Sequence, residues 1–366
     1  MPKKIALVVG ARPNFMKAAP LMRRLQEFSD RYKPILIHTG QHYDHKMSQL
    51  FFDELKMPRP NVYLGVGSGS HAEQTSKIMI ELEKMFTSDR PDLVVVFGDV
   101  NSTMAAAIVA AKAWIKTAHV EAGLRSFDPE MPEEINRIVT DRLSQYLFVS
   151  EPSGLKNLAD EGVADDKIFF VGNIMIDTLV HNLKVSEESK ILDTLGLQPG
   201  EYTVMTLHRP SNVDDPAILN ELLKAVAEIG TKAPVVFPCH PRTAKEMDKH
   251  GGLTAIDPKA LRVLEPLGYL DFLRLQSQAR LVLTDSGGVQ EETTYLQIPC
   301  LTLRYNTERP VTVTEGTNQL IGSDPARLRT SAADILAGKL KKGKIPELWD
   351  GHTAERIVAT FDKILA

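Results

Sequence analysis

The sequence contains two cysteines, Cys239 and Cys300, among 366 residues. So few cysteines exclude a disulfide framework and fit a reducing, cytoplasmic location. No apolar run approaches the roughly 20 residues that a membrane-spanning helix needs, so we expect no membrane insertion. The formal net charge is −4, without blocks of like sign, which gives no reason to expect nucleic acid as a partner.

Two phosphate-binding signatures are also missing. The chain has neither the G-x-G-x-x-G fingerprint of dinucleotide-binding domains nor a Walker A motif. We therefore expect no nicotinamide cofactor, and any phosphate site must be built from other local residues.

The length and the hydrophobic pattern indicate two α/β domains. A chain of 366 residues exceeds what one hydrophobic core usually serves. Short apolar runs alternate with amphipathic stretches of helical period, which is typical of parallel sheets. We place the domain boundary after Gly172, giving domains of residues 1–172 and 173–352.

The predicted strands form two series, one in each domain. The first series is Lys4–Val9, Pro34–His38, Asp92–Phe97, Thr117–Val120, Tyr146–Val149 and Ile168–Val171. The second is Tyr202–Leu207, Pro234–Pro238, Leu261–Leu264, Leu281–Thr284, Cys300–Leu303 and Gln319–Ile321. Helices are predicted at Pro13–Phe28, Ala72–Phe86, Ser102–Trp114, Pro132–Leu143, Pro216–Ile229, Tyr269–Ser277, Val289–Leu296, Pro325–Leu336 and Thr353–Leu365.

The segment 285–292, with sequence DSGGVQEE, follows a predicted strand. Ligands of open parallel sheets bind beyond the carboxyl ends of the strands. Ser286, Gly287 and Gly288 would let the backbone N–H groups of a helix start approach a phosphate, and Glu291 and Glu292 would accept hydrogen bonds from ribose hydroxyls. The alternative is a tight turn whose acidic residues only complement the helix dipole.

Charged residues follow the strands of the first series. Arg12 and Lys17 lie at the start of a helix and would neutralise a diphosphate, or be merely solvated. Asp99 and Glu121 follow neighbouring strands, and Glu133 and Glu134 begin a helix. Carboxylates gathered at one sheet edge acquire different pKa values and hence separate acid and base roles. For each of them, helix capping is the alternative.

Histidines supply two further hypotheses. His208 follows an apolar strand and suits a general acid, or is a hydrogen-bonded structural residue. Arg209 beside it, and His240 after the next strand, are further candidates for substrate binding. His38, His42 and His45 lie close together in the sequence with Asp44, but without a thiol ligand and with Gly40 intervening we predict no metal site.

The motifs together resemble the non-hydrolysing UDP-N-acetylglucosamine 2-epimerases. They are GARPNFMK, TGQHYD, GDVNST, HVEAGLRS, PEEINR, LHRPSN, TDSGGVQEE and NTERP, in the family's order over nearly the whole chain. The resemblance implies a GT-B fold: two Rossmann-like, doubly wound domains facing a central cleft. It also implies that a C-terminal helix, residues 353–366, returns to complete the first domain.

The resemblance also implies roles for individual residues. Asp99, Glu121 and Glu133 are similar to the family's catalytic carboxylates, and His208 to a residue that assists departure of UDP. Those similar to substrate-binding residues are Arg12, Lys17, Arg137, Ser286, Gly287, Gly288, Glu292 and Arg309.

The implied reaction interconverts UDP-GlcNAc and UDP-ManNAc by elimination of UDP to a 2-acetamidoglucal and re-addition. It needs no cofactor and no metal. A cytoplasmic homodimer acting on a small-molecule UDP-sugar for cell-surface polysaccharide synthesis is the corresponding expectation.

The sequence departs from the family pattern in two places. Pro210 and Ser211 stand where many members read RE after HR, and Tyr43 and Asp44 stand in the segment that reads QHREML in members with a second, activating substrate site. Related enzymes act on UDP-diacetamido-uronic acids, which leaves the C3 and C6 substituents of the sugar open. A GT-B glycosyltransferase and a non-catalytic nucleotide-sugar sensor are the competing hypotheses.

Overall fold

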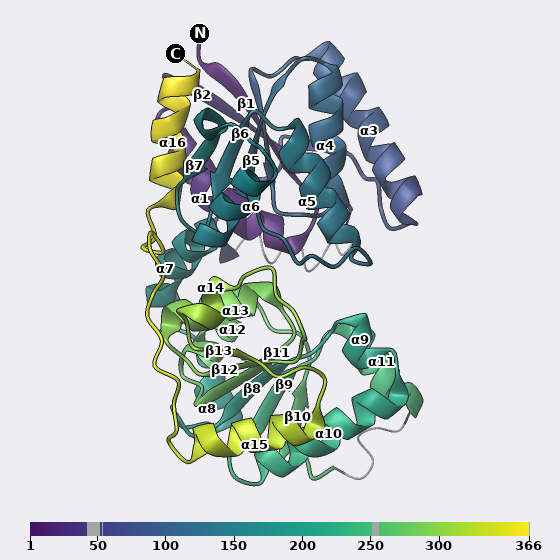
Figure 1. The fold of residues 1–366 in the computed structure, drawn as a ribbon, viewed down its shortest axis with the longest axis vertical. Helices are drawn as coiled ribbons and strands as arrows, with labels where there is room; N and C mark the ends of the chain where they lie inside the picture. The colour runs from purple at the N-terminus through teal and green to yellow at the C-terminus, as the bar shows by residue number, and fades with distance from the viewer. Residues whose placement is uncertain (42–51, 53, 251–255, 366) are drawn as a thin grey trace. The chain divides into compact units, whose positions relative to one another are not determined.

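The computed structural model describes residues 1–41, 52, 54–250 and 256–365. The chain folds into two compact units (Figure 1). The first comprises Met1–His181 and Glu347–Ala366, and the second comprises Asn182–Pro346. Each unit is built around its own parallel β-sheet.

Within the described ranges, the first unit contains a seven-stranded sheet with the order β3-β2-β1-β4-β5-β6-β7. Its strands are β1 (Lys3–Val9), β2 (Tyr32–His38), β3 (Val62–Tyr63), β4 (Leu93–Phe97), β5 (Lys116–Ala122), β6 (Tyr146–Val149) and β7 (Ile168–Phe170). Its helices are α1 (Arg12–Gln26), α3 (His71–Ser88), α4 (Asn101–Lys112), α5 (Pro132–Leu143), α6 (Pro152–Asp160) and α16 (Thr353–Ile364), together with the first part of α7 (Ile174–Ser186). Helices α3, α4 and α5 pack in a row on one side of the sheet, and α1 packs against α16 on the other (Figure 1).

The described part of the second unit contains a six-stranded sheet with the order β10-β9-β8-β11-β12-β13. The strands are β8 (Thr203–Thr206), β9 (Val235–Pro238), β10 (Leu261–Leu264), β11 (Leu281–Thr284), β12 (Cys300–Thr302) and β13 (Asn318–Leu320). The helices are α8 (Ile191–Leu195), α9 (Pro210–Val213), α10 (Pro216–Gly230), α11 (Pro241–His250), α12 (Tyr269–Ser277), α13 (Gly287–Leu296), α14 (Val311–Thr314) and α15 (Pro325–Leu336).

The apolar strands form because both faces of each sheet are covered. All five residues of β4 are fully buried, and such continuous apolar runs are typical of parallel strands with helices on both sides. Helices begin where the sequence supplies caps. Asp215 accepts the backbone N–H of Ala217 (2.8 Å) and is followed by Pro216 at the first helical position of α10.

Helix α16 is bound into the first unit at both of its ends. At its N-terminus the buried Asp177 of α7 accepts the N–H groups of Thr353 (3.0 Å) and Ala354 (2.7 Å). Towards its C-terminus the hydroxyl of Tyr32 donates to Asp362 (2.6 Å). The indole N–H of Trp349, just before the helix, donates to the carbonyl of Ser150 (3.0 Å). The C-terminal segment is therefore part of the first unit's core.

These contacts explain why the first unit extends beyond the expected boundary at Gly172. The first half of α7 is buried in this unit, and Thr178 donates to the carbonyl of Met16 (2.5 Å). In the same way, Trp349 brings the chain back into the unit before the helix that begins at Thr353. Among the described residues, no helix is both long and apolar enough to cross a membrane.

The cap at Asp177 gives a testable prediction. Asp177→Ala leaves two buried N–H groups without their acceptor, so we expect it to destabilise α16 by about 1–3 kcal/mol. Hydrogen exchange of the amides of residues 353–364 should accelerate accordingly. Asp324→Ala is the matched control, because Asp324 caps α15 in the other unit through the N–H groups of Ala326 and Arg327. Equal acceleration of the amides of residues 353–364 in Asp177→Ala and in Asp324→Ala would contradict this role of Asp177.

Candidate active site

The strand order of each sheet reverses at one position, between β1 and β4 in the first unit and between β8 and β11 in the second. Loops that leave neighbouring strands diverge at such a switch point, where open parallel sheets bind their ligands. The predicted residues Arg12 and Asp99 follow β1 and β4, and His208 and Ser286 follow β8 and β11. Each unit therefore has a candidate site at its switch point.

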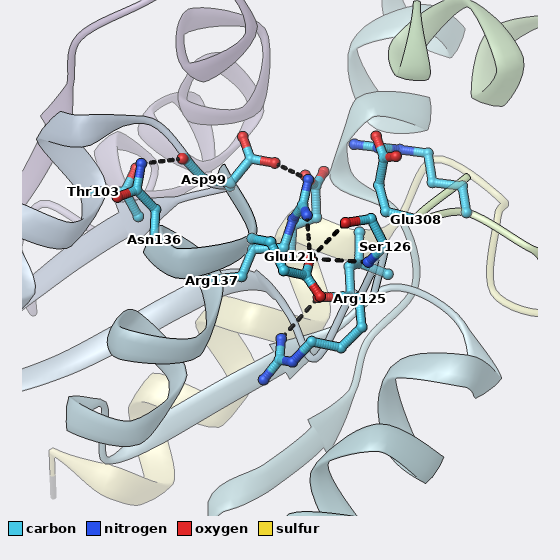
Figure 2. Close-up of polar contacts among 12 residues, drawn as sticks. Asp99, Thr103, Glu121, Arg125, Ser126, Asn136, Arg137 and Glu308 are labelled. Carbon is cyan, nitrogen blue, oxygen red and sulfur yellow. Dashed lines mark hydrogen bonds and ion pairs between the residues drawn. The ribbon is translucent and has the colours of Figure 1, made fainter. Parts of the chain in front are cut away.

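Asp99, in the turn between β4 and α4, forms an ion pair with Arg137 of α5 (Figure 2). Arg137 Nη2 lies 2.5 Å from Asp99 Oδ2, and its Nη1 lies 2.6 Å from Glu134 Oε2. The side chain of Asp99 is 23% exposed, against 3% for Arg137. One buried cation thus serves two carboxylates, and Asp99 is the one that solvent or a ligand can reach.

The adjacent glutamates of α5 have different surroundings. Glu134 is buried and accepts the N–H groups of Ser126 (2.9 Å) and Phe127 (3.0 Å) in addition to its bond with Arg137. Glu133 is half-buried, and the described residues provide it with no hydrogen bond or ion pair. Glu134 is therefore engaged in holding the loop that follows β5, whereas Glu133 has its carboxylate available.

Glu121, near the end of β5, pairs with Lys17 of α1. Lys17 Nζ lies 2.6 Å from Glu121 Oε1, and both side chains are at least 95% buried. Glu121 has a left-handed backbone (φ 76°) at an irregularity in the pairing of β5 with β6. Such strain in a non-glycine residue is typical of functional positions. Arg12 is half-buried at the start of the helix that carries Lys17.

In the second unit, the buried carboxylate of Asp285 organises the residues after β8. Its Oδ2 accepts the N–H groups of His208 (2.9 Å) and Arg209 (2.8 Å), and the side-chain amide of Asn212 (3.1 Å). Its Oδ1 lies 2.8 Å from Nδ1 of His208. Burial raises the pKa of Asp285, but His208 and these N–H groups outweigh that effect and lower it below its usual value.

The pair fixes the orientation of the His208 ring. Because Nδ1 faces Asp285, the other ring nitrogen, Nε2, is left for a ligand, and the side chain is 44% exposed. Arg209 donates through Nε to the carbonyl of Asp285 (3.0 Å). His240 is exposed, with its ring centroid 6.3 Å from that of His208. The structure therefore brings His208, Arg209 and His240 together at the end of β8 and β9.

Helix α13 begins at Gly287, one residue after Ser286. The Ser286 side chain does not cap the helix, so its hydroxyl and the first backbone N–H groups of α13 remain for an anion. A side chain at Gly287 would have to displace two neighbouring side chains, since an added Cβ would lie 2.7 Å from Nη1 of Arg309 and 2.9 Å from Oε1 of Glu308. Arg309 also lies 2.8 Å from Glu291, and Glu292 accepts from the hydroxyl of Tyr269 (3.3 Å).

Sequence reasoning did not single out Asp285 or Glu308 as site residues. Both are acidic residues inside motifs that were recognised, TDSGG and NTERP. The signal was therefore present. The partners of Asp285 lie elsewhere in the chain, at His208 and Asn212, whereas Glu308 pairs with the nearby Arg304 and Arg309. Of the histidine cluster, His42 and His45, with Asp44, lie outside the described residues, while His38 is buried and accepts the N–H of Gly40 through Nδ1 (2.7 Å).

Two doubly wound parallel sheets, each with charged residues at its switch point, define an α/β protein of the GT-B type. A sequence model of the UDP-N-acetylglucosamine 2-epimerase family matches residues 24–362. The chain therefore belongs to this family, which confirms the resemblance inferred from its motifs.

Individual relatives agree over nearly their full lengths. The UDP-N-acetylglucosamine 2-epimerase of Methanocaldococcus jannaschii is 43% identical over 362 residues, which cover 97% of this chain and 98% of the relative. A UDP-2,3-diacetamido-2,3-dideoxy-D-glucuronate 2-epimerase of Pseudomonas aeruginosa is 38% identical over 98% of this chain and 99% of the relative.

Solved structures show the same likeness. The crystal structure of the M. jannaschii UDP-GlcNAc 2-epimerase with UDP-GlcNAc and UDP matches with a TM-score of 0.91 and 42% identity, covering 98% of this chain and 99% of that chain. The Neisseria meningitidis enzyme bound to UDP-GlcNAc matches with a TM-score of 0.89 and 29% identity, covering 98% of this chain and all of the other. The expected GT-B fold class is thereby confirmed.

The lowered pKa of Asp285 predicts a pH-dependent contribution to stability. A carboxylate whose folded pKa lies below its unfolded value of about 3.9 stabilises the fold above that value, and the contribution is lost as pH falls through the folded pKa. Asp285→Asn presents an NH2 group to N–H donors, so we expect the free energy of unfolding to fall by about 1–3 kcal/mol at pH 7. This difference from wild type should shrink below about pH 4.

Urea unfolding at pH 7 and at acid pH, followed by circular dichroism, measures this difference. Asp214→Asn is the control, because Asp214 forms an exposed pair with Arg242, and such pairs contribute only about 0–1 kcal/mol. If Asp285→Asn lowers the free energy of unfolding equally at both pH values, the assignment of a lowered pKa to Asp285 is wrong.

Proposed function

We propose that this protein is a cofactor-free, non-hydrolysing epimerase that interconverts UDP-GlcNAc and UDP-ManNAc by inverting C2 of the sugar. The observation that carries this proposal is the set of carboxylates at and beside the switch point of the first sheet, two of them paired with cations: Asp99 with Arg137, and Glu121 with Lys17. The 43% identity with the M. jannaschii relative supports the choice of substrate.

The proposed reaction needs charge stabilisation and proton transfer, without oxidation. The C1–O bond breaks and its electron pair leaves with UDP. A carboxylate removes the hydrogen at C2 as a proton, and the C2–H electron pair forms the C1=C2 bond of a 2-acetamidoglucal. UDP then adds back at C1 while C2 accepts a proton on the opposite face. Groups able to exchange protons on two faces are therefore required.

We assign the proton transfers and charge stabilisation to Asp99, Glu121 and Glu133. The exposed fraction of Asp99 and the uncommitted carboxylate of Glu133 support these roles. Glu121 is buried and forms an ion pair with Lys17, which brings a positive charge to its carboxylate. Glu134, which binds Arg137 and two backbone N–H groups, is assigned a structural role.

The second unit is proposed to bind UDP. Its supporting features are the open N-terminus of α13 at Ser286, Gly287 and Gly288, and the ring of His208 held by Asp285. His208 would donate a proton or a hydrogen bond to the departing diphosphate. Glu292 is proposed to bind ribose, and the remaining substrate-binding residues are Arg12, Lys17, Arg137, Arg209, His240 and Arg309.

A cytoplasmic homodimer remains our proposal on the strength of the motif resemblance. The second candidate substrate is a UDP-diacetamido-uronic acid, which the 38% identity with the P. aeruginosa relative favours. NMR of the purified protein with a panel of UDP-N-acetylhexosamines and uronic acids distinguishes the two. Equilibration of two UDP-sugars without an acceptor also separates an epimerase from a glycosyltransferase.

Turnover of UDP-GlcNAc in heavy water tests the chemistry. If C2 is deprotonated and reprotonated, deuterium must appear at C2 without added NAD. Asp99→Asn, Glu121→Gln and Glu133→Gln should each lower turnover by about 10²-fold or more, while UDP still binds. Glu134→Gln, at the adjacent residue, is the control variant. We expect it mainly to lower the free energy of unfolding. Two results together would refute the elimination: epimerised product without deuterium, and substrate that is still without deuterium when it is recovered after long incubation.

The second test concerns the diphosphate site. In Gly287→Val the new side chain displaces Arg309 and Glu308 and obstructs the approach of a ligand to the backbone. Loss of one charge-assisted hydrogen bond, about 1.5–3 kcal/mol, corresponds to at least about tenfold weaker UDP binding. Calorimetry measures the affinity, with Gly287→Ala as the smaller substitution expected to give an intermediate loss. Unchanged UDP affinity in a folded Gly287→Val protein would remove this turn from the site.

A further inference from the structure

His119 of β5 is completely buried beside the candidate carboxylates, and the proposed mechanism gives it no part. Both of its ring nitrogens contact oxygen acceptors. Nδ1 lies 2.6 Å from Oδ1 of Asp141, and Nε2 lies 2.8 Å from the carbonyl oxygen of Gly98. Both ring nitrogens of a buried histidine need partners, and here the partners come from two different segments of the chain.

The hydrogen positions follow from the partners. A carbonyl oxygen only accepts, so Nε2 must carry a hydrogen and donate it to Gly98. His119 and Arg125 outweigh the effect of burial and lower the pKa of Asp141. The ring therefore bridges the Gly98 carbonyl and Asp141, within a buried group that includes Arg125 and its partner Glu161.

The Gly98 carbonyl belongs to the peptide group that leads into Asp99. Gly98 has a left-handed backbone (φ 59°), and an added Cβ would lie 2.8 Å from Nζ of Lys17 and 3.4 Å from Oε1 of Glu121. This turn is therefore packed directly against the Lys17–Glu121 pair. The hydrogen bond from His119 fixes the rotation of the peptide group, and with it the direction in which Asp99 leaves the strand.

The neighbouring carbonyls of the turn are held in the same way. The carbonyl of Phe97 accepts from Asn14 (2.9 Å) and from the hydroxyl of Thr103 (2.7 Å). The carbonyl of Asp99 accepts from Asn136 (2.8 Å). With His119 on Gly98, buried or partly buried side chains hold three consecutive carbonyls, so the whole turn is fixed in place.

Through Asp141, the same ring is connected to the segment that follows Glu121. Oδ2 of Asp141 accepts the N–H of Gly123 (3.1 Å) and lies 2.7 Å from Nη1 of Arg125. Gly123 is also left-handed (φ 79°), two residues beyond the strained backbone of Glu121. One hydrogen-bonded unit, His119–Asp141, therefore holds the backbone beside both Asp99 and Glu121.

We propose that His119 is a positioning residue for the epimerisation, which sets the placement of Asp99 relative to Glu121 through its bonds to the Gly98 carbonyl and Asp141. The inference rests on the proposed function, in which these two carboxylates act on the sugar. Misplacement of a catalytic group by about 1 Å can lower a rate by about 10²-fold. The bond from Nε2 to Gly98 is the part that should affect catalysis.

Two substitutions separate the two bonds of the ring. His119→Gln carries an N–H donor near the position of Nε2, and His119→Asn carries one only near the position of Nδ1. We expect His119→Asn to lower kcat for UDP-GlcNAc by about 10²-fold with little change in KM. His119→Gln should recover at least about tenfold of that loss, although both variants lose the aromatic ring.

Tyr32→Phe is the control for a general loss of stability. It removes the hydrogen bond from Tyr32 to Asp362. Tyr32 lies in the same unit as the candidate carboxylates, but on another strand, β2, and far from them in the sequence. It should lower the unfolding temperature while leaving kcat unchanged. Equal loss of kcat in His119→Asn and His119→Gln, in proportion to their loss of unfolding temperature, would show that His119 is merely structural.

The heavy-water experiment on the wild-type protein keeps the two hypotheses apart. If the wild type places no deuterium at C2, the proposed function fails, and this inference with it. If the wild type exchanges C2 and His119→Asn turns over at the same rate, only the positioning role fails. Should neither variant fold, nitrogen-15 NMR of the full chain decides: a hydrogen on Nε2 of His119 supports the bond to the Gly98 carbonyl, and an unprotonated Nε2 overturns it.

Discussion

The buried ion pair between Lys17 and Glu121 constrains the backbone around the candidate carboxylates. Two opposite charges 2.6 Å apart are at least 95% buried, and such a pair is tolerated only when both partners are in place, since removing one leaves an uncompensated buried charge. Glu121 takes a left-handed backbone to reach this position. Gly98 lacks a side chain because the space is already filled by the pair. The local backbone is thus arranged around the electrostatic requirement.

The hydrophobic pattern of the sequence was sufficient to predict most of the sheet. Runs such as Leu281–Thr284 are buried throughout because helices cover both faces, and this strand has the predicted bounds. The two-residue strand β3 at Val62–Tyr63 was not predicted, since a pair of residues carries no periodic signal. Helix α11 at Pro241–His250 was also missed, because its composition is almost entirely polar.

For the site, sequence motifs indicated which segments matter but not how neighbouring residues divide their roles. Glu133 and Glu134 are adjacent and chemically alike, and only the direction in which each leaves α5 separates a carboxylate bound to Arg137 from one that is not. Successive residues of a helix point in directions about 100° apart, so one of the pair had to differ from the other. His119 lies in an apolar strand and gave no signal of its own, because its partners are Gly98 and Asp141, 21 and 22 residues away.

The two sheets share the same order over six strands yet carry different chemistry. In both, the first strand lies beside the fourth, as in β1 with β4 and β8 with β11. The first unit places carboxylates at this switch point, balanced by Arg137 and Lys17, which suits proton transfer. The second places there the N-terminus of α13 and the imidazole of His208, which suits an anion.

The buried carboxylate of the second unit, Asp285, is occupied by backbone N–H groups, an amide and that imidazole, so it positions the groups that would contact a ligand. A nucleotide sugar has one part that needs acids and bases and another that needs donors for phosphate, and each unit has the chemistry for one of them.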